Sequence, residues 1–291
     1  MSAAAAAGAS SPRVISAVGE LRATIQAARP GGQPIGVVQT MGALHAGHVS
    51  LVQAARAECV LTVVTIYVNP TQFGPHEDLA RYPRTLEADL SACGAAGADV
   101  VFVPDDRTMY PAGFSTCVDP PAVAQPLEGQ FRPGHFRGVA TVVLKLFNLV
   151  QPDVAYFGHK DYQQTLVVRR MVQDLDVPVE IRVCPTVREA DGLAMSSRNR
   201  YLSPAERAQA VAVSRSLARA AELVQSGAAN PETVGAEMRH LLTAAGFARI
   251  DYATLADPET LQPVCEIRHP VMALVAAHLG HTRLIDNLRI E

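Results

Sequence analysis

The sequence contains no tryptophan, and aromatic residues make up only 5 % of its 291 positions. A surface that stacks nucleic-acid bases relies on aromatic side chains, so their scarcity argues against single-stranded nucleic acid as a partner. The formal net charge is −3, and a chain of this charge has no strong basic field to attract nucleic acid or an anionic membrane. We therefore expect no nucleic acid and no membrane among its partners.

No apolar run reaches the roughly 18 residues that would predict a membrane-spanning helix. The opening stretch MSAAAAAGASSPR has neither the basic start nor the long apolar segment of a secretory signal, and we expect residues 1–12 to be a disordered tail. The five cysteines are widely spaced, with no C-x-x-C pair. An odd number of scattered thiols favours a reducing compartment, so a cytoplasmic location is expected.

Lysine is also scarce: only two of the 25 basic residues, Lys145 and Lys160, are lysines. An ammonium group is a compact point charge that the planar guanidinium of arginine does not reproduce. Lys145 lies in the apolar stretch VVLKLFNLV, which is typical of a surface lysine whose stem packs along a helix. Lys160 follows an apolar run in YFGHKDYQQ, where it suits either a solvated helix start or the neutralisation of a polyphosphate.

The dominant pattern in the first two thirds of the chain is an alternation of apolar, β-branched runs with segments of helical spacing. The predicted strands are 34–40, 60–68, 98–104, 153–158 and 177–186, and the predicted helices between them are about 46–57, 84–95, 137–150 and 161–175. Continuous apolar strands indicate a sheet that is covered on both faces. This order predicts an α/β fold with a Rossmann-like parallel sheet.

The character of the sequence changes after about residue 188. Two helices are predicted at 203–227 and 230–245, followed by the alternating strands 248–257, 270–280 and 282–291. We therefore predict a Rossmann-like domain at 13–187 and a smaller C-terminal α+β domain at 188–291.

The stretch QTMGALHAGHVSLV follows the first predicted strand and opens a helix near His45. The amides of a helix N-terminus at the carboxyl edge of a parallel sheet are suited to binding phosphate. His45 and His48 share one face of the first helical turn, and Gly47 lets a ligand approach the backbone. The two rings suit contact with phosphate or a structural polar role. A zinc site would need at least one more ligand, and the sequence offers none nearby.

Two further segments carry polar groups that are suited to binding a ligand. The stretch READGLAMSSRNRYLS places Ser196, Ser197 and Arg198 in a loop of the kind that closes over phosphate oxygens. Asn69 and Gln72 follow the end of the second strand in IYVNPTQFG, where neutral amides suit a small hydroxy acid or cap the loop.

The stretch around His45 and His48 resembles the H-x-G-H signature of the nucleotidyltransferase superfamily, and the MSSR loop resembles its second phosphate-binding loop. Class I aminoacyl-tRNA synthetases, cytidylyltransferases and phosphopantetheine adenylyltransferases share this signature. A phosphorylated acceptor would favour basic residues where Asn69 and Gln72 stand, and a tRNA synthetase would need a basic surface. A nucleotide-sensing subunit would be expected to have lost its phosphate-holding residues.

Five blocks together narrow the resemblance: TMGALHAGH, NPTQFGPHEDLARYPRT, RPGHFRGVATVV, FGHKDYQQ and VREADGLAMSSRNRYLS. In their order and spacing they resemble the pantothenate synthetase family, the AMP-forming pantoate–β-alanine ligases of pantothenate and coenzyme A biosynthesis. The resemblance implies an ATP-dependent condensation of (R)-pantoate with β-alanine through a pantoyl-adenylate. It also implies ATP as co-substrate, Mg²⁺ and a homodimer.

The resemblance assigns roles to residues that match the family's motifs. The catalytic residues would be His45, His48, Lys160, Ser196, Ser197 and Arg198. The ATP-binding positions would be Met41, Gly42, Ala43, Leu44, His45, Ala46, Gly47, His48, Gly158, His159, Lys160, Asp161, Val187, Met195, Ser196, Ser197 and Arg198, with Asp161 on the ribose. Gln72, Gln164 and Asn69 would bind the substrates, Asp89 would lie near the metal, and Arg132 and His135 would have supporting roles.

Two positions depart from the family's usual pattern. Gln39 stands where the family usually has proline, and His159 stands where it usually has glutamate. Neither change removes a phosphate-binding group, so we expect activity to be retained.

Overall fold

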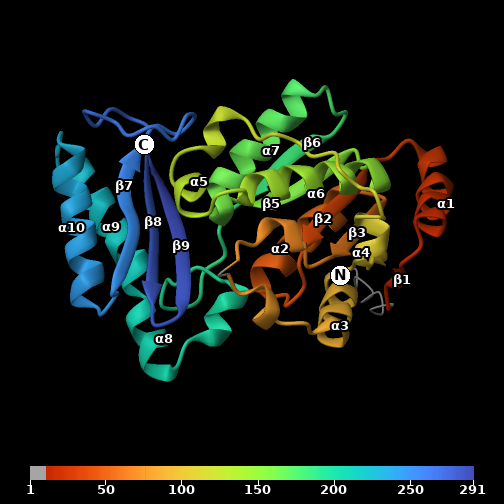
Figure 1. The fold of residues 1–291 in the computed structure, drawn as a ribbon, viewed down its shortest axis with the longest axis horizontal. Helices are drawn as coiled ribbons and strands as arrows, with labels where there is room; N and C mark the ends of the chain where they lie inside the picture. The colour runs from red at the N-terminus through yellow and green to blue at the C-terminus, as the bar shows by residue number, and fades with distance from the viewer. Residues whose placement is uncertain (1–10, 76) are drawn as a thin grey trace, which may run out of the picture.

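The structure is a computed structural model, and it describes residues 11–75 and 77–291. Figure 1 shows two lobes side by side, each built around its own sheet. The lobe formed by the first part of the chain contains a six-stranded sheet, and the lobe formed by the last part contains a three-stranded sheet. Of the predicted tail, residues 1–10 lie outside the described residues.

The larger sheet is parallel throughout, with strand order β1-β4-β3-β2-β5-β6. Its strands are β1 (Arg13–Ile15), β2 (Ile35–Thr40), β3 (Leu61–Ile66), β4 (Val100–Phe102), β5 (Val154–Gly158) and β6 (Glu180–Cys184). The helices of this lobe are α1 (Val18–Ala28), α2 (Ala46–Glu58), α3 (Leu86–Ala96), α4 (Asp106–Met109), α5 (Glu128–Phe131), α6 (His135–Val150) and α7 (Tyr162–Asp174).

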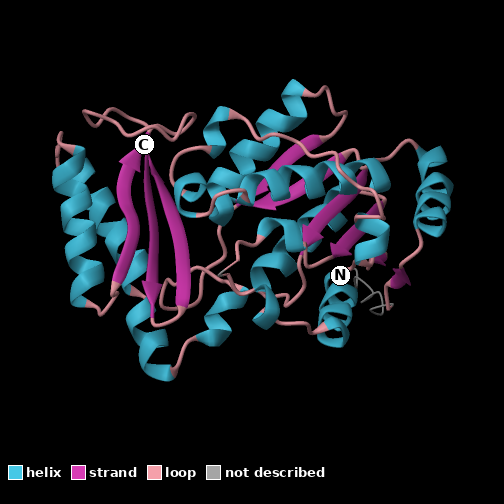
Figure 2. Ribbon diagram, in the orientation of Figure 1, coloured by secondary structure: helices cyan, strands magenta, loops and turns pink. Residues whose placement is uncertain are grey.

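Helices cover both faces of this sheet, as Figure 2 shows. Successive side chains of a strand point to opposite faces, and β2 illustrates the result: Val37 packs with residues of α1, α6 and α7, while Val38 packs with residues of α2 and α3. Both valines are fully buried. Two separate apolar cores therefore hold the sheet, which explains why its strands read as continuous apolar runs.

The smaller lobe contains α8 (Pro204–Ala210), α9 (Ala212–Gln225) and α10 (Pro231–Ala244), followed by β7 (Arg249–Ala256), β8 (Val271–Leu279) and β9 (Thr282–Ile290). The three strands form an antiparallel meander with β8 in the centre. Helices α9 and α10 pack on one face of this sheet (Figure 1), while Tyr162 of α7 packs with Met272 and Leu274 of β8. The larger lobe therefore contacts the smaller sheet directly.

The predicted α/β fold is confirmed, including each predicted strand and the four helices between the strands of the larger sheet. The helix predicted at 203–227 is wrong as a single element, because it is interrupted at Val211. The backbone there, with φ −59° and ψ −22°, departs only slightly from α-helical values. Such a small change in backbone conformation does not alter the spacing of apolar residues, so the sequence pattern does not predict the interruption.

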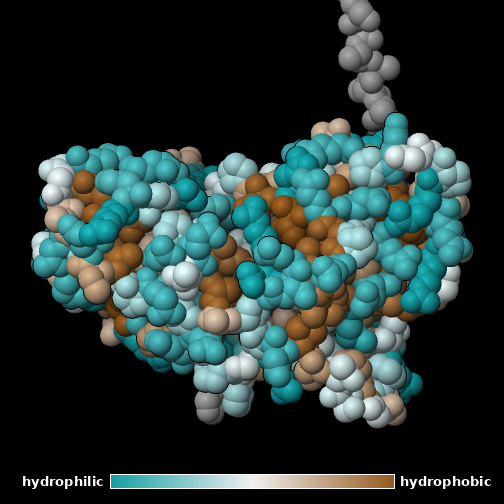
Figure 3. Space-filling model, turned by 90° about the horizontal axis from the view of Figure 1, so that it is seen from above, coloured by the Kyte–Doolittle hydropathy of each residue, from teal (hydrophilic) through white to brown (hydrophobic). Residues whose placement is uncertain are grey.

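The surface seen from above narrows where the two lobes meet, and polar residues separate the apolar patches on this face (Figure 3). Within the described residues, no helix has both the length and the apolar character needed to cross a membrane.

Candidate active site

A pocket opens at the carboxyl edge of the larger sheet, where β2, β3 and β5 end. The loop that follows β6 and the side chains of α6 and α7 complete its walls. Most of the predicted site residues line this pocket: Met41, His45, Gly47, His48, Asn69, Gln72, Gly158, Lys160, Asp161, Gln164, Val187, Met195, Ser196, Ser197 and Arg198. Gly42, Ala43, Leu44, Ala46, His159 and Asp89 do not line it.

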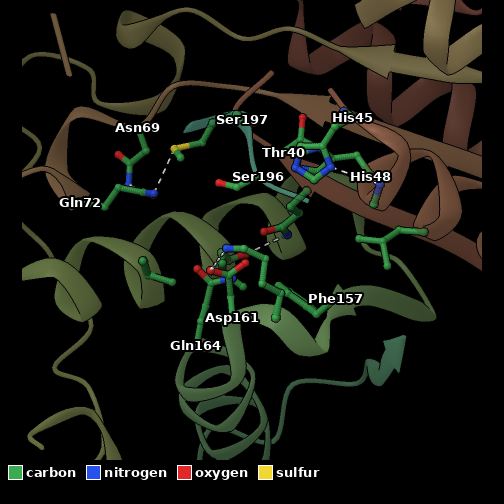
Figure 4. Close-up of a pocket in the computed structure, with 18 of the residues that line it drawn as sticks. Thr40, His45, His48, Asn69, Gln72, Phe157, Asp161, Gln164, Ser196 and Ser197 are labelled. Atoms are coloured by element: carbon green, nitrogen blue, oxygen red, sulfur yellow. Dashed lines mark hydrogen bonds and ion pairs between the residues drawn. The ribbon is translucent and has the colours of Figure 1, made fainter. Parts of the chain in front are cut away.

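His45 and His48 lie side by side at the start of α2 (Figure 4), with their ring centroids 4.1 Å apart. Nδ1 of His45 accepts a hydrogen bond of 3.1 Å from the amide of Gly47, and Nδ1 of His48 accepts one of 3.3 Å from the amide of His45. Because each Nδ1 is an acceptor, the proton of each neutral ring is on Nε2. The local backbone thus fixes one tautomer for both rings.

Burial lowers the pKa of both histidines. The pKa of His45 falls to about 3, with the charges of His48 and Lys160 adding to the effect of burial. The pKa of His48 falls to about 4, again through burial and then Lys160. At neutral pH both rings are therefore uncharged Nε2–H donors, and Lys160 carries the positive charge beside them.

The turn between β2 and α2 is held by a buried carboxylate. Asp89 accepts hydrogen bonds from the amides of Ala43 (3.0 Å) and Leu44 (2.7 Å) and from the hydroxyl of Thr85 (3.2 Å). Ala43 has a φ of 51°, in the left-handed region that costs energy for an alanine. Asp89 stabilises this turn with both of its oxygens, and its assignment to a metal stays a prediction.

Lys160 enters the pocket from the turn between β5 and α7. Its ammonium lies 3.7 Å from a carboxylate oxygen of Asp161. The turn is held from the other lobe by Asn287 of β9, whose Nδ2 donates to the carbonyl oxygens of His159 (3.1 Å) and Lys160 (2.8 Å). The ring of His159 packs against Tyr162 instead of lining the pocket.

Asp286, the neighbour of Asn287 on β9, holds the segment that leads into Met195. Its buried carboxylate pairs with Arg188 at 2.6 and 3.0 Å. Arg188 also donates to the carbonyl of Gly192 and thereby closes the hairpin that leads into Met195. Two adjacent residues of β9 thus connect the turn of Lys160 with the loop that carries the predicted MSSR motif.

The two serines of this loop differ in their hydrogen bonds. Ser197 is buried, and its hydroxyl donates to the carbonyl of Ala43 at 2.9 Å. The hydroxyl oxygen of Ser196 accepts from the amide of Arg198 at 3.3 Å, so its own proton is free for another acceptor. The guanidinium of Arg198 is paired with Asp78 through bonds of 3.0 and 2.8 Å.

Two amides, those of Asn69 and Gln72, lie together on the side of the pocket opposite His45 and His48 (Figure 4). Asn69 is buried, donates to the carbonyl of Gly138 and to Oε1 of Gln72, and accepts from Thr71 and Tyr110. Its polar atoms are thus occupied within the protein, and it orients Gln72.

Gln72 turns its Nε2 toward the sulfur of Met41 at 3.0 Å, which is a weak acceptor. Gln164 extends into the pocket from α7 (Figure 4). Unlike Asn69, these two side chains are therefore available to a ligand.

Arg132, just after α5, and His135, the first residue of α6, support this group. His135 contacts the carbonyl of Gln72 at 2.8 Å and the guanidinium of Arg132 at 3.0 Å, and Arg132 pairs with Glu77 at 2.7 Å. Burial and the neighbouring Arg132 lower the pKa of His135 to about 4. The chain of contacts fixes the main chain beside Gln72.

The sequence did not reveal the roles of Asp78, Asp286 and Asn287. Asp78 lies in one of the matched blocks, but its partner Arg198 is 120 residues away along the chain. Asn287 is more than 120 residues from the turn it holds. Only the docking of the two lobes brings these groups together.

A sequence model of the protein family described as Pantoate-beta-alanine ligase matches residues 13–289 of this chain. The chain is 53 % identical over 277 residues to "Pantothenate synthetase 1" of Bradyrhizobium diazoefficiens, covering 95 % of this chain and 97 % of that protein. The pantothenate synthetase of Thermus thermophilus superposes with a TM-score of 0.90 at 47 % identity, covering 95 % and 98 % of the two chains. A pantoate-beta-alanine ligase from Francisella tularensis, complexed with beta-gamma ATP and beta-alanine, superposes with a TM-score of 0.80 at 32 % identity over 96 % and 97 %.

Proposed function

The chain belongs to the pantoate–β-alanine ligase family and catalyses the ATP-dependent condensation of pantoate with β-alanine, and we propose that both steps take place in the pocket described above. In the first step a carboxylate oxygen of pantoate attacks the α-phosphorus of ATP, and pyrophosphate leaves. In the second step the amine of β-alanine attacks the acyl carbon, AMP leaves, and pantothenate is formed.

The observation that carries this proposal is the meeting of three separate motifs around one pocket. The hydrogen bond from Ser197 to Ala43 fixes the MSSR loop against the turn before α2, and Lys160 faces the same space. Transfer at a phosphorus atom needs charge stabilisation and alignment more than covalent help from the protein. A fixed arrangement of donors is suited to that task.

The phosphate groups of ATP are bound, in this proposal, by one charge and several neutral donors. Lys160 supplies the positive charge. The Nε2–H groups of His45 and His48 donate to phosphate oxygens as negative charge develops on these oxygens. Ser196 adds a hydroxyl donor, while Ser197 acts by holding the loop. Arg198 reaches the phosphates from its position on Asp78.

The remaining predicted ATP positions surround the nucleoside. Asp161 is half-exposed beside Lys160, and its carboxylate suits the ribose hydroxyls. Gly158, Val187 and Met195 line the pocket next to it and are assigned to the adenosine. Four predicted ATP positions do not line the pocket, namely Gly42, Ala43, Leu44 and Ala46. We therefore assign them an indirect role, in which they form the backbone of the turn and the start of α2.

Pantoate lies against Gln72 and Gln164 in this proposal. Amides donate to a carboxylate without pairing with it as a cation would, so the carboxylate remains nucleophilic. The apolar side chains of Val139, Val142, Val143 and Leu146 line the same pocket and suit the two methyl groups of pantoate. The role of Asn69 is to orient Gln72.

Mg²⁺ is proposed to enter with the ATP phosphates. Within residues 11–75 and 77–291, no group of three or more His, Cys, Asp or Glu side chains is arranged to hold a metal ion. The oxygens of Asp89 are bonded to two amides and a hydroxyl, so they do not fit direct metal binding. No step is assigned to a protein-bound metal. Mg²⁺ held mainly by substrate phosphates would need no cluster of protein carboxylates.

Three wider features belong to the same proposal. The domain limit is placed between residues 187 and 188, which is supported by the change from the parallel sheet to the antiparallel one.

A homodimer is proposed because two-fold dimers are the commonest soluble oligomers and because the family resemblance implies one. A cytoplasmic location is supported by the five free cysteines.

The experiment supplies ATP, Mg²⁺ and pantoate with and without β-alanine, and follows pyrophosphate and AMP. Pyrophosphate is expected to depend on pantoate, and multiple-turnover AMP formation is expected to depend on β-alanine as well. Pyrophosphate release supported by phosphopantetheine in place of pantoate would contradict the proposal.

A further inference from the structure

The side-chain oxygen of Gln39 is an acceptor without a donor. Gln39 extends from the end of β2 into the wall of the pocket, where its Nε2 donates a long hydrogen bond of 3.4 Å to the carbonyl of Val143 in α6. Its Oε1 is shielded from solvent and has no hydrogen-bond partner among the described residues. A buried acceptor in this state is destabilising, and a donor supplied by a ligand would recover that loss.

The surroundings of this amide are apolar. Val143, whose carbonyl Gln39 contacts, lines the pocket together with Val139, Val142 and Leu146 of the same helix. None of these side chains carries a donor, and the main-chain amides of α6 are engaged in its own helix. Since no described residue donates to Oε1, a bound substrate or a water molecule is left to supply the donor.

We propose that Oε1 of Gln39 accepts a hydrogen bond from the terminal hydroxyl of pantoate and so makes the enzyme select a hydroxylated acid. This inference rests on the proposed function of the same pocket. The carboxylate of pantoate must face the α-phosphate near Lys160, and the opposite end of the molecule carries a hydroxymethyl group beside two methyl groups. The methyl groups match the valine wall, and the hydroxyl needs an acceptor within it.

The contact requires a rotation of the side-chain amide of Gln39. The last torsion of a glutamine is soft, with a broad range of allowed angles. The bond that holds Nε2 is long and correspondingly weak. Turning the amide so that Oε1 faces the pocket gives up this long bond of Nε2, and in exchange the buried acceptor gains a hydrogen bond from the ligand.

The test compares pantoate with 2-hydroxy-3,3-dimethylbutanoate, which lacks only the terminal hydroxyl, in the wild type and in Gln39→Met. Methionine keeps the length of the side chain and replaces the amide oxygen with a much weaker acceptor. Pyrophosphate release is measured with ATP and Mg²⁺ at varied acid concentration. The preference for pantoate in kcat/KM is expected to be about tenfold or more larger in the wild type than in the variant. Gln39→Leu repeats the comparison if Gln39→Met does not fold.

A second analogue serves as the control. The acid 4-hydroxy-3,3-dimethylbutanoate lacks the other hydroxyl, and both proteins are expected to discriminate against it equally. If the wild type and both variants prefer pantoate over the first analogue to the same degree, the oxygen of Gln39 is satisfied by water and the proposal is overturned. If the wild type releases no pyrophosphate with pantoate at all, the proposed function itself fails, which is a distinct result.

Discussion

The hydroxyl of Ser197 donates a hydrogen bond of 2.9 Å to the carbonyl oxygen of Ala43, across 154 positions of the chain. This bond joins the loop after β6 to the turn before α2. Arg200 of the same loop donates to the next carbonyl, that of Leu44, at 3.2 Å. The loop after β6 is therefore docked on the backbone that presents the two histidines.

The two serines are expected to respond differently to alanine. Ser197→Ala leaves the buried carbonyl of Ala43 without its donor, and it should lower the free energy of unfolding by about 1–2 kcal/mol. Ser196→Ala should leave stability close to that of the wild type and lower the rate of pyrophosphate release. Denaturant unfolding and the pyrophosphate assay separate the two effects. Equal losses of stability in both variants would contradict the division of roles.

The second prediction compares the only two lysines of the sequence. Lys160→Met removes the positive charge beside the histidines and should cost about 3 kcal/mol or more of transition-state stabilisation. Lys145→Met is the matched control, because its ammonium lies over the ring of Phe114, 4.6 Å from the centroid. Steady-state kinetics of both variants should show a large loss of kcat/KM for Lys160 alone. A near-wild-type Lys160→Met would reject its assignment to phosphate.

The third prediction concerns pH. The pKa of His45 is lowered from 6.5 to about 3 and that of His48 from 6.5 to about 4. Between these values and pH 6.5 the unfolded chain binds more protons than the folded one, so the free energy of unfolding falls as the pH falls through this window. Above pH 6.5 the two rings contribute no slope.

Unfolding of the wild type and of His48→Gln at a series of pH values tests this statement. The variant should show a smaller decrease of stability between pH 6.5 and pH 4, because one depressed histidine is gone. If the free energy of unfolding changes with pH by the same amount in both proteins, His48 is not held neutral by its burial.

The fourth prediction concerns Asn287. Asn287→Ala removes both hydrogen bonds to the turn that presents Lys160, and it should weaken ATP binding by about tenfold, as expected for the loss of roughly 1.4 kcal/mol. Tyr252→Phe is the control, because it removes a hydrogen bond of 2.7 Å between the lobes, to Glu128, away from that turn. ATP titration with pantoate absent measures the difference. A loss of equal size in both variants would indicate general loosening of the lobes.

The fifth prediction separates turn support from metal binding at Asp89. Asp89→Asn replaces an oxygen that accepts from backbone amides and should lower stability by about 1–3 kcal/mol. The Mg²⁺ concentration that gives half-maximal activity should remain that of the wild type. A several-fold increase in that concentration would mean that the carboxylate binds the metal.

The sequence predicted those features that follow from local patterns. His45, Gly47 and His48 lie where the spacing placed them, because a strand, a glycine turn and a helix start are encoded within about ten residues. Lys160 follows β5 for the same reason. The parallel sheet follows from the apolar runs, since strands covered on both faces have few polar positions.

Other features depend on contacts between distant segments, and no local pattern reports them. The tautomer of His45 depends on the amide of Gly47, and the different roles of Ser196 and Ser197 depend on which oxygen each hydroxyl meets. The support of Lys160 by Asn287 requires the two lobes to be docked. The unpaired side-chain oxygen of Gln39 likewise depends on the packing of α6 against β2, where its contact Val143 is 104 residues away along the chain.

The transfer of one oxygen atom tests the proposed reaction most directly. Pantoate labelled with ¹⁸O in its carboxylate is incubated with the enzyme, ATP, Mg²⁺ and β-alanine, and the products are analysed by mass spectrometry. Attack on the α-phosphorus leaves the attacking oxygen on AMP when the amine displaces it, so AMP should carry one ¹⁸O. Unlabelled AMP, or label found in inorganic phosphate together with ADP, would contradict a pantoyl-adenylate formed in this pocket.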